Sequence, residues 1–107
     1  MEESDYHKLV AKAFRRIEDA LEDVDPDVVD STGTGDVLTL TFASGVRCVL
    51  NTQRPVRQLW MAARDSAWHF DYDPASERWT DDRGRGLELF ATLGRVIAEQ
   101  SGLHVEI

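Results

Sequence analysis

The chain has 107 residues with 42% hydrophobic and 30% charged side chains, which predicts a single folded domain spanning residues 1–107. Its formal net charge of -8 disfavours nucleic acid and anionic lipid as partners, because both repel a surface of the same sign. The sequence has no apolar run of about eighteen residues and begins with the acidic segment MEESDYHK, which matches no targeting signal, so we expect no membrane span and a cytoplasmic location.

The first expected element is an amphipathic helix over residues 5–24. Its apolar positions recur every three or four residues; they are Tyr6, Leu9, Val10, Ala13, Phe14, Ile17, Leu21 and Val24. Ser4 is the expected N-cap. Because Pro26 disfavours helical geometry at Asp25, we expect the helix to end near Val24.

About six short strands are expected next, separated by turn-forming residues. The first two cover residues 28–32 and 37–42, and Leu38, Leu40 and Phe42 mark the core face of the second. The third, residues 46–51, places Cys48 and Leu50 on the core face. Three more strands lie in QLWMAA, AWHFDY and ERWT. The aromatic residues expected to fill the core are Trp68, Phe70, Tyr72 and Trp79.

A second helix is expected over residues 86–100, from the spacing of Leu87, Phe90, Leu93 and Ile97, with Gly102 closing it. Strands joined by tight turns form a mostly antiparallel meander, and two helices at the ends of the chain can cover only one of its faces. The sequence therefore predicts an α+β fold, a two-layer α/β sandwich whose other sheet face is open to water.

Seven carboxylates and no basic residue occupy the stretch EDALEDVDPDVVD. They are Glu18, Asp19, Glu22, Asp23, Asp25, Asp27 and Asp30. Acidic groups at the end of a helix oppose its dipole, at about 0.3 to 1 kcal/mol each, so stability does not favour this pattern. One interpretation is a solvated face of an acidic protein. The other is a ridge of oxygen ligands for hard cations such as Fe(II), Fe(III), Mn(II), Ca(II) or Mg(II).

The spacing of Asp23, Asp25 and Asp27 matches the first three ligand positions of an EF-hand loop. The required glycine and glutamate positions hold Val28 and Thr34, so no closed calcium site is expected. Any metal should bind in an open, exposed and weak site. His7 precedes the acidic turns on the same helix and is a further candidate ligand, since imidazole suits iron.

Trp60 is expected on the open face of the sheet. Period-2 alternation sets it opposite Leu59 and Met61, so burying Trp60 would expose both of them. A tryptophan on a strand is more often a core residue. An exposed one beside Asn51 and three arginines is typical of a protein-binding hot spot. The arginines are Arg47, Arg54 and Arg57.

No catalytic signature is present, which predicts a protein that is not an enzyme. The sequence contains no nucleophile elbow, no P-loop and no zinc-protease motif, and its three histidines are scattered. The single cysteine, Cys48, allows neither a disulfide nor a cysteine-based metal site within one chain. Its place on a core face favours a buried apolar role over a nucleophilic one.

The segment NTQRPVRQLWMA, Asn51 to Ala62, resembles the N-x-Q-x-P-x-x-Q-x-W-x-A signature of the frataxin family at all six positions. The opening SDYHKL, the acidic end of the first helix, the strand WHFDYD and the element order are similar as well. The resemblance covers essentially the whole chain and is of the bacterial type. It implies an iron-binding protein of iron-sulfur cluster assembly.

For the sites, the resemblance implies that the acidic ridge binds Fe(II) and Fe(III) weakly, with other divalent cations able to compete, and contacts a basic surface of the cysteine desulfurase. It also implies that the open face meets the assembly machinery, including the scaffold protein. The residues concerned are Asn51, Gln53, Gln58 and Trp60. The expected activity is regulation of the desulfurase in response to iron, with iron donation as a further role, by a chain that is monomeric without metal.

A second hypothesis is a small acidic secretion chaperone that binds an effector segment, because such chaperones share the low pI and an α/β fold. They are usually stable dimers with a large apolar groove. Size-exclusion chromatography without metal separates the two hypotheses, since a stable dimer favours the chaperone and a monomer favours the frataxin-like protein.

Overall fold

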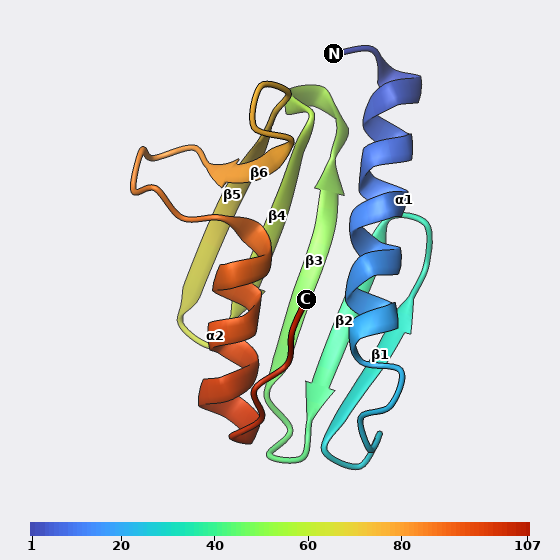
Figure 1. Cartoon of the computed structure of the whole chain (residues 1–107), viewed down its shortest axis with the longest axis vertical. Coiled ribbons are helices and arrows are strands. Elements are labelled where there is room, and N and C mark those ends of the chain that lie inside the picture. The colour runs from blue at the N-terminus through green and yellow to red at the C-terminus, as the bar shows by residue number, and fades with distance from the viewer.

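Two helices and six strands account for the architecture of the computed structural model, which describes all 107 residues. In chain order the elements are α1 (Glu3–Ala20), β1 (Val29–Gly33), β2 (Val37–Phe42), β3 (Arg47–Gln53), the 3-10 turn η1 (Arg54–Val56), β4 (Gln58–Ala63), β5 (Ser66–Asp73), β6 (Arg78–Asp81) and α2 (Leu89–Ser101). The strands form one antiparallel sheet whose spatial order is the chain order. Both helices cover the same face (Figure 1), so the predicted two-layer α+β sandwich is confirmed.

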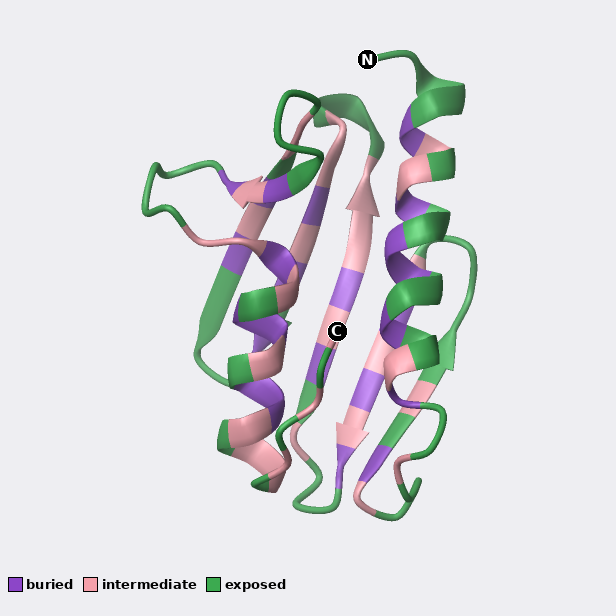
Figure 2. Cartoon of the chain, viewed as in Figure 1, coloured by how far each residue is buried: buried purple, intermediate pink, exposed green.

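The core lies between this sheet and the helices, and the strand register builds it. Leu38, Leu50, Met61 and Trp68 oppose one another across four neighbouring strands, and all four are buried. Figure 2 shows buried positions alternating with half-buried ones along the central strands. Tyr72, expected in the core, is only half-buried and packs at its rim.

The ends of α1 differ from the prediction. The helix begins at Glu3 with Glu2 at the N-cap position, so Ser4 lies in the first turn and is not the cap. It ends at Ala20, because the N–H of Leu21 is shared between two carbonyls and the chain continues in tighter turns. No basic residue lies in the last turn to offset the helix dipole. Leu21 remains buried, so the apolar period extends past the helix that it predicted.

The start of α2 is set by a cap that the apolar pattern does not reveal. The carboxylate of Glu88 accepts hydrogen bonds from the backbone N–H groups of Phe90 and Ala91, at 2.9 and 3.0 Å, so the helix begins at Leu89 and not at residue 86. Gly102, with φ of 77°, ends it as expected. Neither helix combines the length and the apolarity needed to cross a bilayer.

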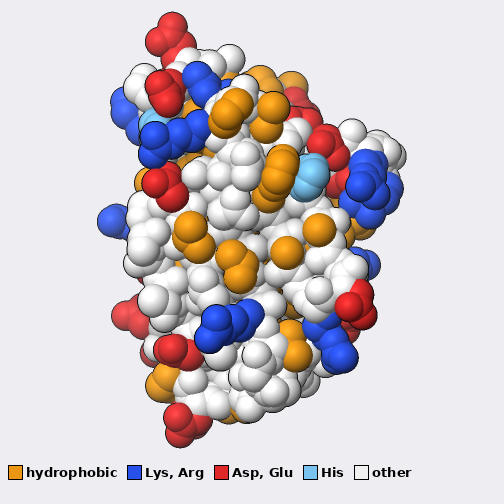
Figure 3. All heavy atoms as spheres, turned by 180° about the vertical axis from the view of Figure 1, so that it is seen from behind, with side chains coloured by type: hydrophobic (Ala, Val, Ile, Leu, Met, Phe, Trp, Pro, Cys, Tyr) orange, Lys and Arg blue, Asp and Glu red, His pale blue; other side chains and the backbone are white.

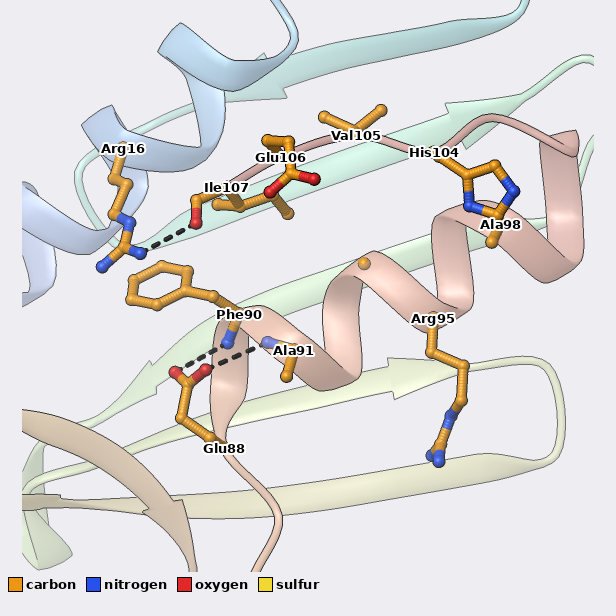
Figure 4. Close-up of a pocket in the computed structure, with 11 residues that line it drawn as sticks. Arg16, Glu88, Phe90, Ala91, Arg95, Ala98, His104, Val105, Glu106 and Ile107 are labelled. Atoms are coloured by element: carbon orange, nitrogen blue, oxygen red, sulfur yellow. Dashed lines mark hydrogen bonds between the residues drawn. The ribbon is translucent and has the colours of Figure 1, made fainter.

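The tail after α2 runs back between the two helices. Arg16 on α1 donates a hydrogen bond to the backbone oxygen of Ile107 at 2.8 Å, and its guanidinium lies 4.0 Å from the ring centre of Phe90 on α2. A hollow of about 430 Å³ lies beside this contact (Figure 4). The tail therefore links the two helices above the sheet.

Candidate metal ridge and partner-binding face

The seven carboxylates of the acidic ridge lie on three parts of the fold. Glu18 and Asp19 are on the last turn of α1, and Asp30 is on β1. The other four, Glu22, Asp23, Asp25 and Asp27, lie in the turns between these two elements. All seven are exposed and none forms an ion pair. Their charge therefore remains available to a cation or to a basic surface.

The strand β1 divides this ridge. The side chain of Glu18 lies over the end of β1, where its Oε2 is 3.6 Å from the position of a Cβ added at Gly33. Val29 is buried beneath the helices, so alternation turns Asp30 to the opposite face, in register with Thr41. Asp30 is thus on the open face of the edge strand, and the ridge passes around that edge.

No three histidine, cysteine, aspartate or glutamate side chains are close enough to hold one metal ion. The carboxylate oxygens suit hard cations, and their spread suits weak binding by one or two groups together with water. One carboxylate has a structural task already, since Asp25 accepts a hydrogen bond from the N–H of Asp27 at 2.9 Å.

His7 is not brought to the ridge. It lies in the first turns of α1, eleven residues before Glu18, which along a helix is about 16 Å. Its Nε2 lies 3.7 Å from a carboxylate oxygen of Glu3. The fold therefore leaves His7 and the acidic ridge at opposite ends of the same helix.

The open face of the sheet is largely uncharged in its centre. Register aligns Thr39, Val49 and Ala62 in one row, and Val37, Asn51, Trp60 and His69 in the next. Figure 3 shows hydrophobic side chains spread across the middle of this face, with most charged groups near its margins. In a chain with 30% charged residues, this arrangement favours contact with another protein.

The residues implied by the sequence signature come together on this face. Trp60 opposes Asn51, and Gln58 opposes Gln53, across β3 and β4. Trp60 is half-buried because its ring stacks on that of His69, with centroids 4.0 Å apart and planes inclined by 11°. Its indole Nε1–H donates to Oε1 of Gln58 at 2.8 Å. The position of Trp60 outside the core agrees with the sequence analysis.

Three residues around Trp60 were missed by the sequence analysis, namely His69, Asp71 and Asp82. The amide Nε2 of Gln58 donates to Asp71 at 3.0 Å and to Asp82 at 3.1 Å. The alternation of AWHFDY could have placed His69 and Asp71 on the face of Trp60, since Trp68 and Phe70 point to the core. Asp82 carries no such signal, because it lies after β6 in a turn.

Two of the three arginines expected around Trp60 have other contacts, and the third, Arg47, lies opposite Thr41, four residues along β3 from the Asn51 that opposes Trp60. Arg54 forms an ion pair with Asp36 at 3.2 Å. Arg57 adopts a left-handed backbone conformation with φ of 53° at the end of η1, and its guanidinium lies 5.8 Å from the ring centre of Tyr6. Arg54 therefore ties the turn before β4 to the turn between β1 and β2, and Arg57 packs that turn on α1.

Tyr6 fixes that turn from below. Its hydroxyl donates to the backbone oxygen of Gln58 at 2.6 Å and accepts from the N–H of Gln53 at 3.1 Å. Burial raises the pKa of Tyr6, and this effect exceeds the lowering by the hydrogen bond from Gln53 and by the charges of Arg57 and Arg54. The strand ends that carry both glutamines are thus tied to α1.

Asp81 organises the turn that carries Asp82. Its buried carboxylate accepts hydrogen bonds from the N–H of Arg83 and from the N–H and Nε of Arg85, at 3.1, 2.8 and 3.0 Å. Burial alone raises the pKa of Asp81, but these hydrogen bonds and the Arg85 charge outweigh it and lower the pKa below its usual value. The turn after β6 is therefore held by a buried carboxylate at the end of the edge strand.

Comparison with known proteins identifies the family. A family model described as a frataxin-like domain matches residues 1–103. The protein named iron-sulfur cluster assembly protein CyaY of Pseudomonas aeruginosa is 43% identical over 106 residues, covering 99% of this chain and 96% of that protein. The protein of the same name from Tolumonas auensis is 36% identical over 107 residues, covering 100% and 99%.

Solved structures agree with this match. Frataxin from Psychromonas ingrahamii superposes with a TM-score of 0.89 at 31% identity, over 99% of this chain and 97% of that one. Trimeric frataxin from Saccharomyces cerevisiae, complexed with ferrous iron, shares the fold, with a TM-score of 0.64 at 24% identity over 96% and 88% of the two chains. With the signature residues Asn51 to Ala62 on its open face, the chain belongs to the frataxin family.

Proposed function

We propose that this protein binds iron weakly and regulates iron-sulfur cluster assembly, by contacting the cysteine desulfurase and the scaffold protein in an iron-dependent way. The observation that carries the proposal is the combination, in one frataxin-family chain, of seven exposed carboxylates without ion pairs and an open sheet face whose centre, which holds Trp60, is largely uncharged. Relatives of bacterial origin bear the name iron-sulfur cluster assembly protein. The proposal assigns no catalytic step to this chain.

The acidic ridge is assigned to iron and to the basic surface of the desulfurase. Carboxylate oxygens are suitable ligands for Fe(II) and Fe(III), and the absence of a three-ligand cluster favours weak binding in which manganese or calcium can compete. The same exposed charges attract a basic protein surface and accelerate its encounter. If metal and partner use the same carboxylates, each weakens the binding of the other.

The open face is assigned to the scaffold protein, with Asn51, Gln53, Gln58 and Trp60 as the residues involved. Its uncharged rows resemble the core of a protein interface, and Trp60 is the residue type that most often dominates such a contact. The proposal includes a chain that is monomeric without metal and works in the cytoplasm. The secretion-chaperone hypothesis is not retained, because a frataxin-like family model matches residues 1–103.

A desulfurase turnover assay tests the regulatory proposal. The rate is measured with and without this protein over a series of Fe(II) concentrations, and we expect the protein to change it by an amount that depends on iron. Alongside, Fe(II) should selectively perturb the backbone amide resonances of residues 19–30. A turnover rate that never responds to the protein would refute the regulatory role. Unperturbed amide resonances would show that the ridge is only a solvated surface and not an iron site.

A further inference from the structure

On the open face, both the amide nitrogen and the amide oxygen of Gln58 form side-chain hydrogen bonds. Its Nε2 donates to Asp71 and Asp82, at 3.0 and 3.1 Å, and its Oε1 accepts from the indole of Trp60 at 2.8 Å. Ionised carboxylates only accept hydrogen bonds, so the two aspartates require the amide nitrogen to face them. The amide oxygen must then face Trp60.

A second restraint acts on the ring of Trp60. His69 lies directly opposite on β5, and the two rings stack at 4.0 Å. A tryptophan side chain has few rotatable bonds, so a hydrogen bond at the ring nitrogen combined with a stack on the ring face fixes its orientation. The indole is held in one position before any partner arrives.

The support for this arrangement comes from the turn after β6, which stands out from the sheet before α2 in Figure 1. Asp81 clamps the turn through its buried carboxylate, and the N–H of Asp82 donates to the backbone oxygen of His69 at 2.9 Å. This backbone hydrogen bond places the Asp82 carboxylate within hydrogen-bond distance of Gln58. A segment 24 residues away in sequence thus orients Gln58.

We propose that Gln58, oriented by Asp71 and Asp82, is a positioning residue that fixes the indole of Trp60 against His69 for partner binding. The inference rests on the proposed function, because it concerns the same open face. It assigns Gln58 to the support of Trp60 and not to direct contact. Because the indole N–H is already bonded, the partner is expected to lay an apolar or planar group on the ring instead of accepting that hydrogen bond.

The first test uses the free protein and Gln58→Leu, which removes the acceptor at nearly constant volume. The indole N–H of Trp60 should exchange with solvent roughly threefold to tenfold faster, and its NMR resonance should move. Gln53→Leu is the matched control, since Gln53 faces Gln58 in register but has no side-chain bond to Trp60. Unchanged exchange and resonance in Gln58→Leu would overturn the proposal.

The second variant, Gln58→Glu, tests the hydrogen-bond pattern through pH. The groups that face the new carboxyl are Asp71 and His69 on β5 and Asp82 in the turn, whose carboxylate also lies 3.7 Å from Nδ1 of His69, while the Arg57 guanidinium lies against Tyr6. Ionised, it is repelled by the two aspartates and the indole is released. Protonated, it can donate to an aspartate and accept from Trp60 as the amide does, so the Trp60 resonance should return as the pH falls. A resonance that stays displaced at every pH contradicts the proposal.

The third test measures the affinity for the purified scaffold protein. We expect Gln58→Leu to weaken it by roughly threefold to tenfold, and Trp60→Ala to weaken it more. If Gln58→Leu frees the indole of Trp60 in the exchange experiment but keeps the full affinity for the scaffold protein, the positioning role is overturned and the proposed function remains intact. An unchanged affinity in Trp60→Ala overturns the assignment of the open face, independently of the result in the free protein.

Discussion

The acidic ridge and the Trp60 face are organised by different physical principles. The ridge carboxylates are exposed, unpaired and distributed over a helix, a turn and an edge strand, so they act mainly through their summed charge. Around Trp60, by contrast, the side chains of Trp60, Gln58, Asp71 and Asp82 are joined by hydrogen bonds. A ridge of this kind therefore tolerates small changes of geometry, whereas the face is sensitive to them.

The largest difference between the two regions should come from single truncations. Trp60→Ala removes the central side chain of the face, and we expect its affinity for the scaffold protein to fall by about 30-fold to 1000-fold. Asp23→Ala removes one of seven ridge charges and should change desulfurase affinity by no more than about threefold. Isothermal titration calorimetry of both variants checks this contrast. Equal losses would show that the two regions do not differ in this way.

Reversing charge should affect the ridge where truncation does not. We expect Asp19→Lys with Glu22→Lys to weaken desulfurase binding by about 10-fold to 100-fold, because attraction to a basic surface becomes repulsion. Stability should be kept or raised, since lysine near the end of α1 suits the helix dipole.

The control for this reversal is Asp65→Lys with Glu106→Lys, which makes the same change in net charge at two exposed positions away from the ridge. Surface plasmon resonance and thermal unfolding measure both pairs. If the control pair weakens binding as strongly, only net charge matters and the ridge is not a specific surface.

The face should be the more sensitive of the two to a change beneath it. Tyr6→Phe removes the hydroxyl that bonds Gln53 and Gln58, and we expect a loss of about 1 to 3 kcal/mol in the free energy of unfolding. Because the pKa of Tyr6 is raised in the folded state, its contribution is fully present below the usual tyrosine value and is lost as the pH rises through the raised one.

Urea denaturation between pH 7 and pH 11 measures this effect, and the variant should lose less stability than the natural chain over the alkaline part of the range. The Trp60 resonance serves as a local readout of the same change. A variant with full stability at pH 7 would mean that α1 does not support the face through Tyr6.

The smallest effect concerns the loss of folding stability at low pH through Asp81, which holds the turn after β6. The folded pKa of Asp81 is depressed, so its contribution is present above the unfolded value and is lost as the pH falls through the folded one. Asp81→Asn should be less stable at neutral pH, and its stability should fall less steeply below about pH 4. Urea denaturation from pH 6 to pH 3 tests this. Parallel curves for the two proteins would contradict the assignment.

Much of the sheet could be predicted because alternation is a local property. Leu59 and Met61 cannot both be buried unless Trp60 points to the other side, and that constraint alone located Trp60 correctly. The end of α1 could not be read in the same way. Leu21 and Val24 continue the apolar period, but the chain has already left the helix and reaches the core from a turn.

The missed part of the site depends on contacts between distant segments. Asp82 meets Gln58 because it continues the pairing of β6 with β5 by one residue, with its N–H bonded to the backbone oxygen of His69, and this pairing of distant segments is not visible in the residues near Asp82. The charge of the ridge was visible in the sequence, but its division by β1 was not. That division follows from Val29, whose burial sends Asp30 to the opposite face.

Cys48 lies fully buried near the start of β3, and burial raises the pKa of its thiol to about 12. At physiological pH almost none of it is a thiolate, which is the form that attacks sulfur, oxidants and alkylating reagents. The only thiol of the chain is therefore unreactive in the folded protein and is not suited to carry sulfur. The same property makes the chain a convenient host for a single engineered surface cysteine, because a thiol-specific probe would find only the new site.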